Sequence, residues 1–244
     1  MSVELPPRPD LVRLEPARSR LRSVPWGPLE AIPVFVIALL LTVIGGIPVG
    51  LIVASGGSRF VWWALVNELG FLGAVVLWVR VVRRSPLGAL GMPRRPLRDI
   101  GVGLLAGGGL VVVGWIAGIV VVLVAQLILG HPPAQPEQIP SDVEGPNLLL
   151  SGFVVVLAAP LGEEVFFRGF LFQGLRRRFA VWPAALISAA LFALVHISPL
   201  LIFALFPIGV GLAWIYERRQ SVLASMAAHA LFNLVGMLTI ALTR

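Results

Sequence analysis

Apolar residues in this chain occur in long runs without formal charge, rather than on one side of soluble amphipathic helices. The uncharged windows cover residues 31–58, 100–136, 145–162, 179–216 and 220–243. About 20 apolar helical residues cross the roughly 30 Å hydrocarbon core of a bilayer. The pattern therefore predicts an all-α fold, a polytopic bundle of transmembrane helices.

The windows and the polar residues between them predict seven membrane spans. The spans are expected at about residues 31–54, 60–80, 100–129, 147–172, 182–197, 200–216 and 221–241. Four regions follow from them. They are an Arg/Pro-rich tail (1–30, largely disordered over 1–28), N-terminal transmembrane helices (31–130), a loop (131–146) and a C-terminal transmembrane core (147–241).

Arginine is unevenly distributed among the connecting segments. Residues 80–98 hold six arginines, 176–178 three and 218–219 two, whereas 130–146 hold none. Basic residues are enriched in cytoplasmic loops of membrane proteins. We therefore predict a cytoplasmic N-terminus, an extracytoplasmic loop 131–146, and a location in the cytoplasmic (inner) membrane of a bacterium.

Composition supports the membrane assignment and removes several kinds of site. The chain is 58% hydrophobic and 13% charged, against about 45–50% and 25% in soluble domains. The absence of cysteine excludes disulfides, thiolate metal sites and a cysteine nucleophile. The net charge of +7 is most simply a topology signal, so membrane lipid is an expected partner and nucleic acid is not.

Polar residues interrupt three of the predicted spans. One carries Glu163, Glu164 and Arg168, another His196, and the last His229 and Asn233. A charged side chain at the centre of a bilayer costs about 2.5–3.5 kcal/mol on insertion scales. At 1.5 Å per helical residue, Glu163 and His196 both lie roughly 20 Å from the predicted cytoplasmic surface. We therefore expect the three spans to gather these groups into one polar site.

The spacing divides the polar residues by role. Glu164 and Arg168 are four residues apart and can pair on one helix face, which leaves Glu163 as the freer carboxylate. Glu163 with His196 could hold and deprotonate a water molecule. His229 and Asn233, also four residues apart, could donate hydrogen bonds to the oxyanion of a tetrahedral intermediate. This set suits amide hydrolysis.

A metal site is an alternative for the same residues. Glu163, His196 and His229 could instead bind Zn²⁺ and leave a position for water. Asparagine is an uncommon zinc ligand and no His-x-x-x-His pair lies on one helix, so the sequence slightly favours the metal-free mechanism.

The motifs Glu163-Glu164-x-x-x-Arg168, Phe192-x-x-x-His196 and His229-x-x-x-Asn233 resemble those of the CAAX prenyl protease and bacteriocin-processing (CPBP) family of intramembrane peptidases. The resemblance covers about residues 147–241. It implies that Glu163 and His196 activate water. It further implies that His229 and Asn233 stabilise the oxyanion, and that Glu164 and Arg168 support them.

The resemblance predicts an intramembrane endopeptidase acting on a membrane-associated or lipidated peptide or protein. Eukaryotic members of the family process prenylated CAAX proteins, which are not an expected substrate in a bacterium. Two other hypotheses stay open: a non-enzymatic membrane scaffold or immunity protein, and a proton-coupled transporter, because buried Glu and His also form proton relays.

Two further features yield weaker predictions. Asn67 and Glu68 are costly in lipid; we expect them at the membrane interface or in a helix–helix hydrogen bond rather than lining the site. The pairs Gly46/Gly50 and Gly114/Gly118 have the small-xxx-small spacing of close helix contacts.

Overall fold

The computed structural model describes residues 24–53, 57–134 and 146–243. The described residues form helices and connecting turns and contain no strand, which confirms the predicted all-α polytopic bundle. The N-terminal helices are α2 (Ala31–Ile52), which follows the short 3₁₀ turn η1 (Pro28–Glu30), and α3 (Gly57–Leu77), which continues into the π-helical turn η2 (Trp78–Val82). The 3₁₀ turn η3 (Leu87–Leu90) then leads to α4 (Pro96–Leu129).

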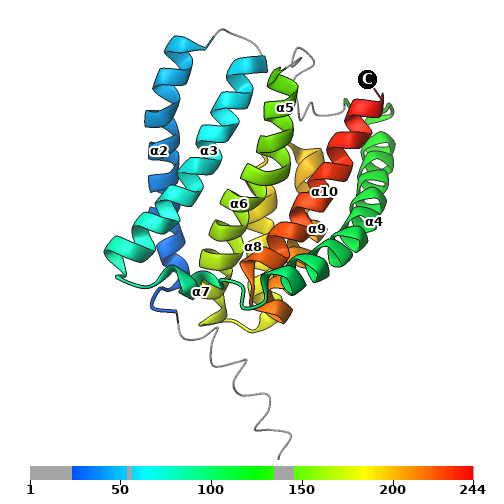
Figure 1. Cartoon of the computed structure of the whole chain (residues 1–244). Coiled ribbons are helices and arrows are strands. Elements are labelled where there is room, and N and C mark those ends of the chain that lie inside the picture. The colour runs from blue at the N-terminus through cyan, green and yellow to red at the C-terminus, as the bar shows by residue number, and fades with distance from the viewer. Residues whose placement is uncertain (1–23, 54–56, 135–145, 244) are drawn as a thin grey trace, which may run out of the picture.

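The C-terminal half begins with one continuous rod of alternating α- and π-helical pieces. The rod consists of α5 (Pro146–Phe153), η4 (Val154–Ala158), α6 (Ala159–Glu164), η5 (Val165–Phe172) and α7 (Gln173–Arg176). It is followed by α8 (Val181–Leu194), α9 (Pro199–Arg219) and α10 (Val222–Thr243). In Figure 1 the α5–α7 rod lies between an α2–α3 pair and an α4–α10 pair.

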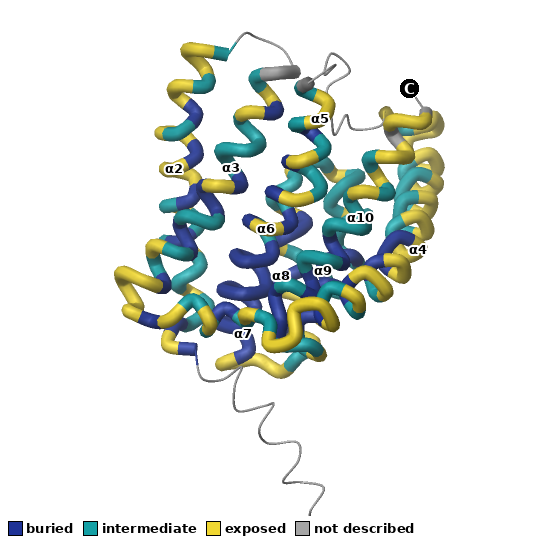
Figure 2. The backbone as a smooth tube through the Cα atoms, in the orientation of Figure 1, coloured by how far each residue is buried: buried dark blue, intermediate teal, exposed yellow. Residues whose placement is uncertain are grey.

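Six helices in the described part of the chain are long and apolar enough to cross a membrane, so the chain is an integral membrane protein. The outer faces of α2 and α4 are exposed and apolar, whereas the buried residues concentrate along the rod (Figure 2). The predicted fifth span is shorter than expected. Its helix α8 has 14 residues, or about 21 Å, because the chain leaves the helix at a tight turn before Pro199.

The arginine-rich connections lie at one end of the bundle. The α3–α4, α7–α8 and α9–α10 connections all lie at the end where α2 begins, and α4 ends at the other (Figure 1). The predicted orientation requires the arginine-rich loops to lie on one side of the membrane, as they do here. The orientation itself remains a prediction.

The predicted tail boundary is wrong at its C-terminal end. Residues 1–23 lie outside the described residues, but Val24 and Trp26 are buried. The Trp26 Nε1–H donates to the Phe170 carbonyl at 2.9 Å, and its ring stacks on that of Phe170 with centroids 5.0 Å apart. Glu30 accepts hydrogen bonds from Gly27 N and Trp78 Nε1. One large aromatic side chain can bury enough surface to hold such a segment, which the Arg/Pro-rich composition concealed.

Glycine contacts are close, but only partly at the predicted pairs. A Cβ at Gly46 would collide with the Trp63 ring, whereas one at Gly50 would meet nothing within 4 Å. Gly114 faces Phe232, but nothing lies within 4 Å of a Cβ at Gly118. A pair that was not predicted brings the backbones of α4 and α10 together: Gly103 lies against the Ala224 carbonyl and Gly107 against the Ala228 carbonyl.

Candidate active site

The two adjacent glutamates have different partners, as their spacing predicted. Glu164 Oε1 accepts a hydrogen bond from Arg168 Nη1 at 2.7 Å, and both side chains are fully buried. Arg168 Nη2 also donates to the Gly209 carbonyl of α9 at 3.1 Å. Its guanidinium lies 4.5 Å from the centroid of the Phe192 ring. The charge of Glu164 is therefore neutralised within a rigid cluster that joins the rod to α8 and α9.

His229 of α10 links the two glutamates. Its Nδ1 lies 3.0 Å from Glu164 Oε1, and its Nε2 lies 3.7 Å from Glu163 Oε2. An ionised carboxylate only accepts hydrogen bonds, so the Nδ1 must donate to Glu164. This contact fixes the tautomer and the ring orientation, and it turns Nε2 toward Glu163.

Of the two adjacent glutamates, Glu163 is the one without a hydrogen bond in the described part of the chain. Its side chain is 14% exposed, and its Oε2 is buried with no hydrogen-bond partner. Hydrogen bonds need about 2.7–3.2 Å for N–H···O, so the 3.7 Å separation from His229 Nε2 is a near contact rather than a bond. Glu163 therefore matches the predicted freer carboxylate.

Glu68 of α3 is a neighbour of the site that the sequence interpretation placed elsewhere. It is buried, and it lies close enough to Glu163 for the two charges to interact. Its Oε1 accepts from Asn67 Nδ2 at 3.2 Å, whereas its Oε2 has no partner. Gly162 makes this approach possible, because a Cβ there would lie 2.7 Å from Glu68 Oε2. The sequence signal for Glu68 was the cost of an acid in a membrane span. That cost does not show which neighbouring helix the side chain faces.

His196 lies in the turn between α8 and α9. Its Nδ1 donates to the Phe192 carbonyl at 3.0 Å, which leaves Nε2 as an acceptor in the neutral ring. The next residue, Ile197, has φ 62°, a left-handed conformation that is rare for a β-branched residue. In the described part of the chain no hydrogen bond or ion pair joins His196 to Glu163. The two histidines instead contact the same ring: the Phe192 centroid lies 5.2 Å from that of His196 and 5.7 Å from that of His229.

Asn233 reaches the rod one helical turn after His229. Its Nδ2 donates to the Val155 carbonyl at 2.8 Å. In the π-helical turn η4, the Ala159 amide donates a hydrogen bond to the Val154 carbonyl, five residues earlier. With the same spacing, the donor to the Val155 carbonyl would be Pro160, which has no amide hydrogen. The asparagine therefore satisfies a carbonyl that proline leaves free, and one of its two amide hydrogens remains available.

The zinc hypothesis concerns Glu163, His196 and His229. No group of three His, Cys, Asp or Glu side chains among residues 24–53, 57–134 and 146–243 is placed to hold a metal ion. The Nδ1 contacts of His229 with Glu164 and of His196 with the Phe192 carbonyl leave both Nε2 atoms free, which is also how zinc-ligating histidines are held. The metal-free mechanism therefore stays a prediction.

The C-terminal half of the chain is similar to one family of known proteins. Residues 145–235 match the family model described as "Type II CAAX prenyl endopeptidase Rce1-like". This match confirms the resemblance to the CPBP family, and it supports a CAAX-type intramembrane protease at the level of the family. The matched segment contains the rod, α8, α9 and most of α10, and so every residue of the predicted site.

Two curated proteins are similar over longer or shorter parts of the chain. An "Uncharacterized 24.3 kDa protein" of Escherichia coli is 28% identical over 196 residues, covering 75% of this chain and 82% of that protein. The "UPF0177 protein YxdF" of Lactococcus lactis is 31% identical over 103 residues, covering 39% of this chain and 54% of its own length. No solved structure matches the chain.

Proposed function

We propose that this protein is an intramembrane endopeptidase that hydrolyses a peptide bond of a membrane-associated or lipidated peptide or protein. One observation carries the proposal. Glu163 presents a buried, unpartnered carboxylate oxygen 3.7 Å from Nε2 of an oriented histidine, while Arg168 neutralises the adjacent Glu164. A free base beside an oriented imidazole is the arrangement that general acid–base hydrolysis requires.

In the proposed reaction Glu163 accepts a proton from a water molecule. The oxygen of that water attacks the carbonyl carbon of the substrate, and the carbonyl π electrons move to its oxygen. The tetrahedral intermediate then collapses: the C–N bond breaks, and the proton held by Glu163 passes to the leaving amine. His196, whose Nε2 is an acceptor, is the second group proposed to hold the water, after a small movement of the turn that carries it.

The negative charge on the substrate oxygen needs donors. His229 Nε2, when protonated, and the free amide hydrogen of Asn233 are the proposed ones, since both lie on one face of α10 and one turn apart. A single donor of this kind is worth about 10²–10³ in kcat. Glu164 acts through His229, because its hydrogen bond to Nδ1 sets the direction of Nε2.

The proposed class of substrate follows from position and family. Apolar helices surround the site, and the matching family is one of prenyl-protein endopeptidases. We therefore propose that the substrate reaches the site from the membrane or its cytoplasmic surface and carries an apolar segment or a lipid group.

The test compares purified variants in detergent on a library of fluorogenic peptides, each synthesised with and without an acyl or prenyl group. Glu163→Gln keeps the size of the side chain and removes the base, so kcat should fall by about 10²–10⁴ with an unchanged melting temperature. Glu137→Gln, which changes an acid in the predicted extracytoplasmic loop, is the control and should retain activity.

Histidine variants complete the test. His196→Ala should lose activity, whereas His131→Ala, which removes an exposed histidine in the loop after α4, should not. Peptide cleavage at the full rate by Glu163→Gln would reject the role assigned to Glu163. A Glu163→Gln protein that keeps the biological effect without cleaving peptides would instead support a scaffold or immunity protein.

A further inference from the structure

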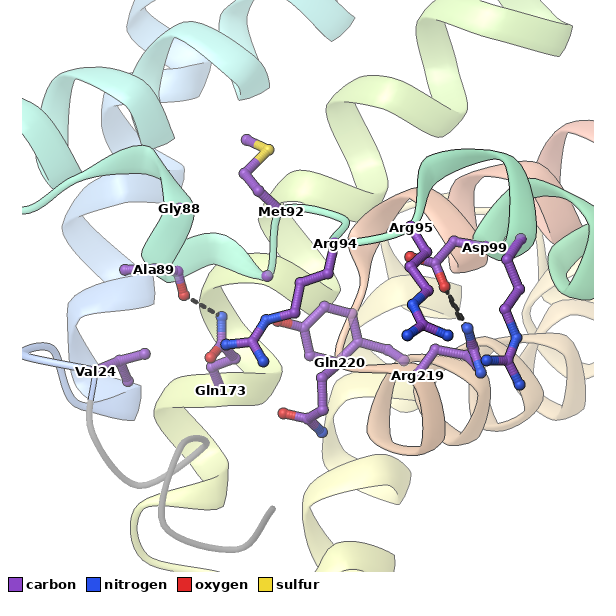
Figure 3. Close-up of a pocket in the computed structure, with 13 residues that line it drawn as sticks. Val24, Gly88, Ala89, Met92, Arg94, Arg95, Asp99, Gln173, Arg219 and Gln220 are labelled. Atoms are coloured by element: carbon purple, nitrogen blue, oxygen red, sulfur yellow. Dashed lines mark hydrogen bonds and ion pairs between the residues drawn. The ribbon is translucent and has the colours of Figure 1, made fainter. Parts of the chain in front are cut away.

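A cavity lies away from the glutamate–histidine site, at the end of the bundle where the arginine-rich connections gather (Figure 3). Its volume is about 480 Å³, within the range of small-molecule sites. Four arginines line it, together with a single carboxylate, Asp99. The arginines are Arg94, Arg95, Arg98 and Arg219.

The charge in this cavity is not balanced by the protein. Arg219 Nη2 donates to Asp99 Oδ1 at 2.6 Å, and Nε donates to the same oxygen at 3.2 Å. Asp99 is thereby neutralised. The other three arginines are exposed and have no ion pair in the described part of the chain. In Figure 3 the Arg94 side chain extends toward Gln173, across the cavity.

The wall below the arginines is fixed before any ligand binds. Three consecutive carbonyls of the turn at η3 are each held by a different helix: Gln173 Nε2 donates to Ala89 O at 2.8 Å, Tyr216 Oη to Leu90 O at 3.0 Å, and Val222 N to Gly91 O at 2.8 Å. Gly91 has φ 87° and lies against the Tyr216 ring, where a side chain would collide. The cavity is thus a preformed recess rather than a loose surface of basic loops.

The placement of two arginines also conflicts with local helix electrostatics. Arg95 is the N-cap of α4 and Arg98 lies in its first turn, where the helix dipole disfavours positive charge. Residues that break a local rule of helix stability often belong to a functional site. A bound anion would offset the repulsion between these arginines and the positive end of the helix dipole.

We propose that this cavity binds a phosphate-bearing anion, a phosphodiester or phosphomonoester group. Arginine forks match phosphate oxygens in geometry and charge. Exposed apolar side chains, Met92 and Leu97, flank the arginines, so the neighbourhood favours a phospholipid headgroup over free phosphate. Basic pockets at the cytoplasmic ends of transmembrane helices are suited to such headgroups. This proposal does not depend on the proposed peptidase activity.

The experiment measures binding by native mass spectrometry and by thermal shift, using the full chain in detergent. The probes are phosphatidylglycerol, phosphatidylcholine and inorganic phosphate. The double variant R94Q/R98Q is compared with R177Q/R178Q, which removes the same charge from two exposed arginines at the same end of the bundle but outside the cavity.

R94Q/R98Q removes two guanidinium groups that line the cavity, and with them charge-assisted hydrogen bonds to the phosphate group. It should therefore bind phosphatidylglycerol at least about tenfold more weakly, whereas R177Q/R178Q should bind it as the unaltered protein does. Pocket-dependent binding of inorganic phosphate at comparable affinity would identify a soluble ligand as the source of the same group. Equal losses in both double variants, or no loss in either, would overturn the proposal, because the arginines would then act only through overall charge.

Discussion

At the scale of residues, the difference between Glu163 and Glu164 arises from their neighbours and not from their type. Glu164 has an arginine four residues later and a histidine from α10, whereas no hydrogen bond joins Glu163 to Arg168 in the described part of the chain. The spacing Glu-Glu-x-x-x-Arg was enough to predict this, because the 100° step of a helix separates adjacent side chains. Contacts between helices are harder to predict from the sequence. The approach of Glu68 to Glu163 depends on Gly162, and the His229 bridge depends on how α10 meets the rod.

Ile197 offers a test of His196 at this scale. Its left-handed backbone costs roughly 1–2 kcal/mol, and its side chain is 84% exposed, so little packing would be lost on its removal. Ile197→Gly should raise the free energy of unfolding by up to about 1 kcal/mol. It should also lower kcat several-fold, because His196 would be held less firmly. Thermal unfolding and peptide cleavage of the same preparation measure both quantities.

The variant Ile197→Asn separates the effect of backbone strain at residue 197 from the effect of a more mobile turn. Asparagine tolerates the left-handed region better than isoleucine but is less free than glycine, so this variant should gain stability and keep its activity. If Ile197→Gly instead cleaved peptides at the original rate, the turn would have no part in positioning His196.

At the scale of elements, the sequence predicted where the helices are but not how they deviate. Long apolar runs identified the spans. The π-helical turns η4 and η5 were not predicted, because a widened turn is selected by tertiary contacts rather than by composition. The short α8 has a related cause. It ends where His196 and Ile197 leave the helix, although the apolar run continues through Pro199 into α9.

Variants of Pro160 and Asn233 can separate the structural role of Asn233 from its proposed catalytic role. Asn233→Ala leaves the Val155 carbonyl without its donor, which should cost about 1–3 kcal/mol. It should also lower kcat by about 10²–10³ if the amide contributes to the oxyanion site. Pro160→Ala introduces an amide hydrogen at the position that the register of η4 assigns to Val155.

Combining the two substitutions shows whether Asn233 supports the helix or stabilises the oxyanion. In the double variant Pro160→Ala/Asn233→Ala, stability should return toward the original value while cleavage stays slow. Recovery of cleavage together with stability would show that Asn233 acts only by shaping the rod. The single variant Pro160→Ala, which retains Asn233, is the control for any bend that proline gives to the helix.

At the scale of the whole molecule, the bundle brings the family-like C-terminal half and the N-terminal helices into one body. The match to the family ends at residue 145 on the N-terminal side, yet Glu68 of α3 reaches the site, and Trp26 anchors the chain beneath η5. Sequence patterning gave the correct fold class for the whole. It could not show that residues 24–30 belong to the folded body, since one buried indole decides this and the surrounding Pro and Arg residues suggest a tail.

The orientation in the membrane is the remaining property at this scale, and the chain is suited to measuring it because it contains no cysteine. Arg177→Cys and His131→Cys each place a single exposed thiol at opposite ends of the bundle. If the arginine-rich end is cytoplasmic, a membrane-impermeant maleimide should label His131→Cys in intact spheroplasts. It should label Arg177→Cys only in inverted vesicles or after permeabilisation.

Both cysteine variants retain the information that directs insertion, because Arg176 and Arg178 remain beside position 177 and the loop at His131 contains no arginine to lose. Labelling of Arg177→Cys from outside would reverse the assignment. The proposed phosphate-binding cavity would then face away from the cytoplasmic leaflet, and its ligand would have to come from the outer one. Labelling of both sites from both sides would show that the chain inserts in two orientations, and the arginine distribution would then be too weak to set its topology.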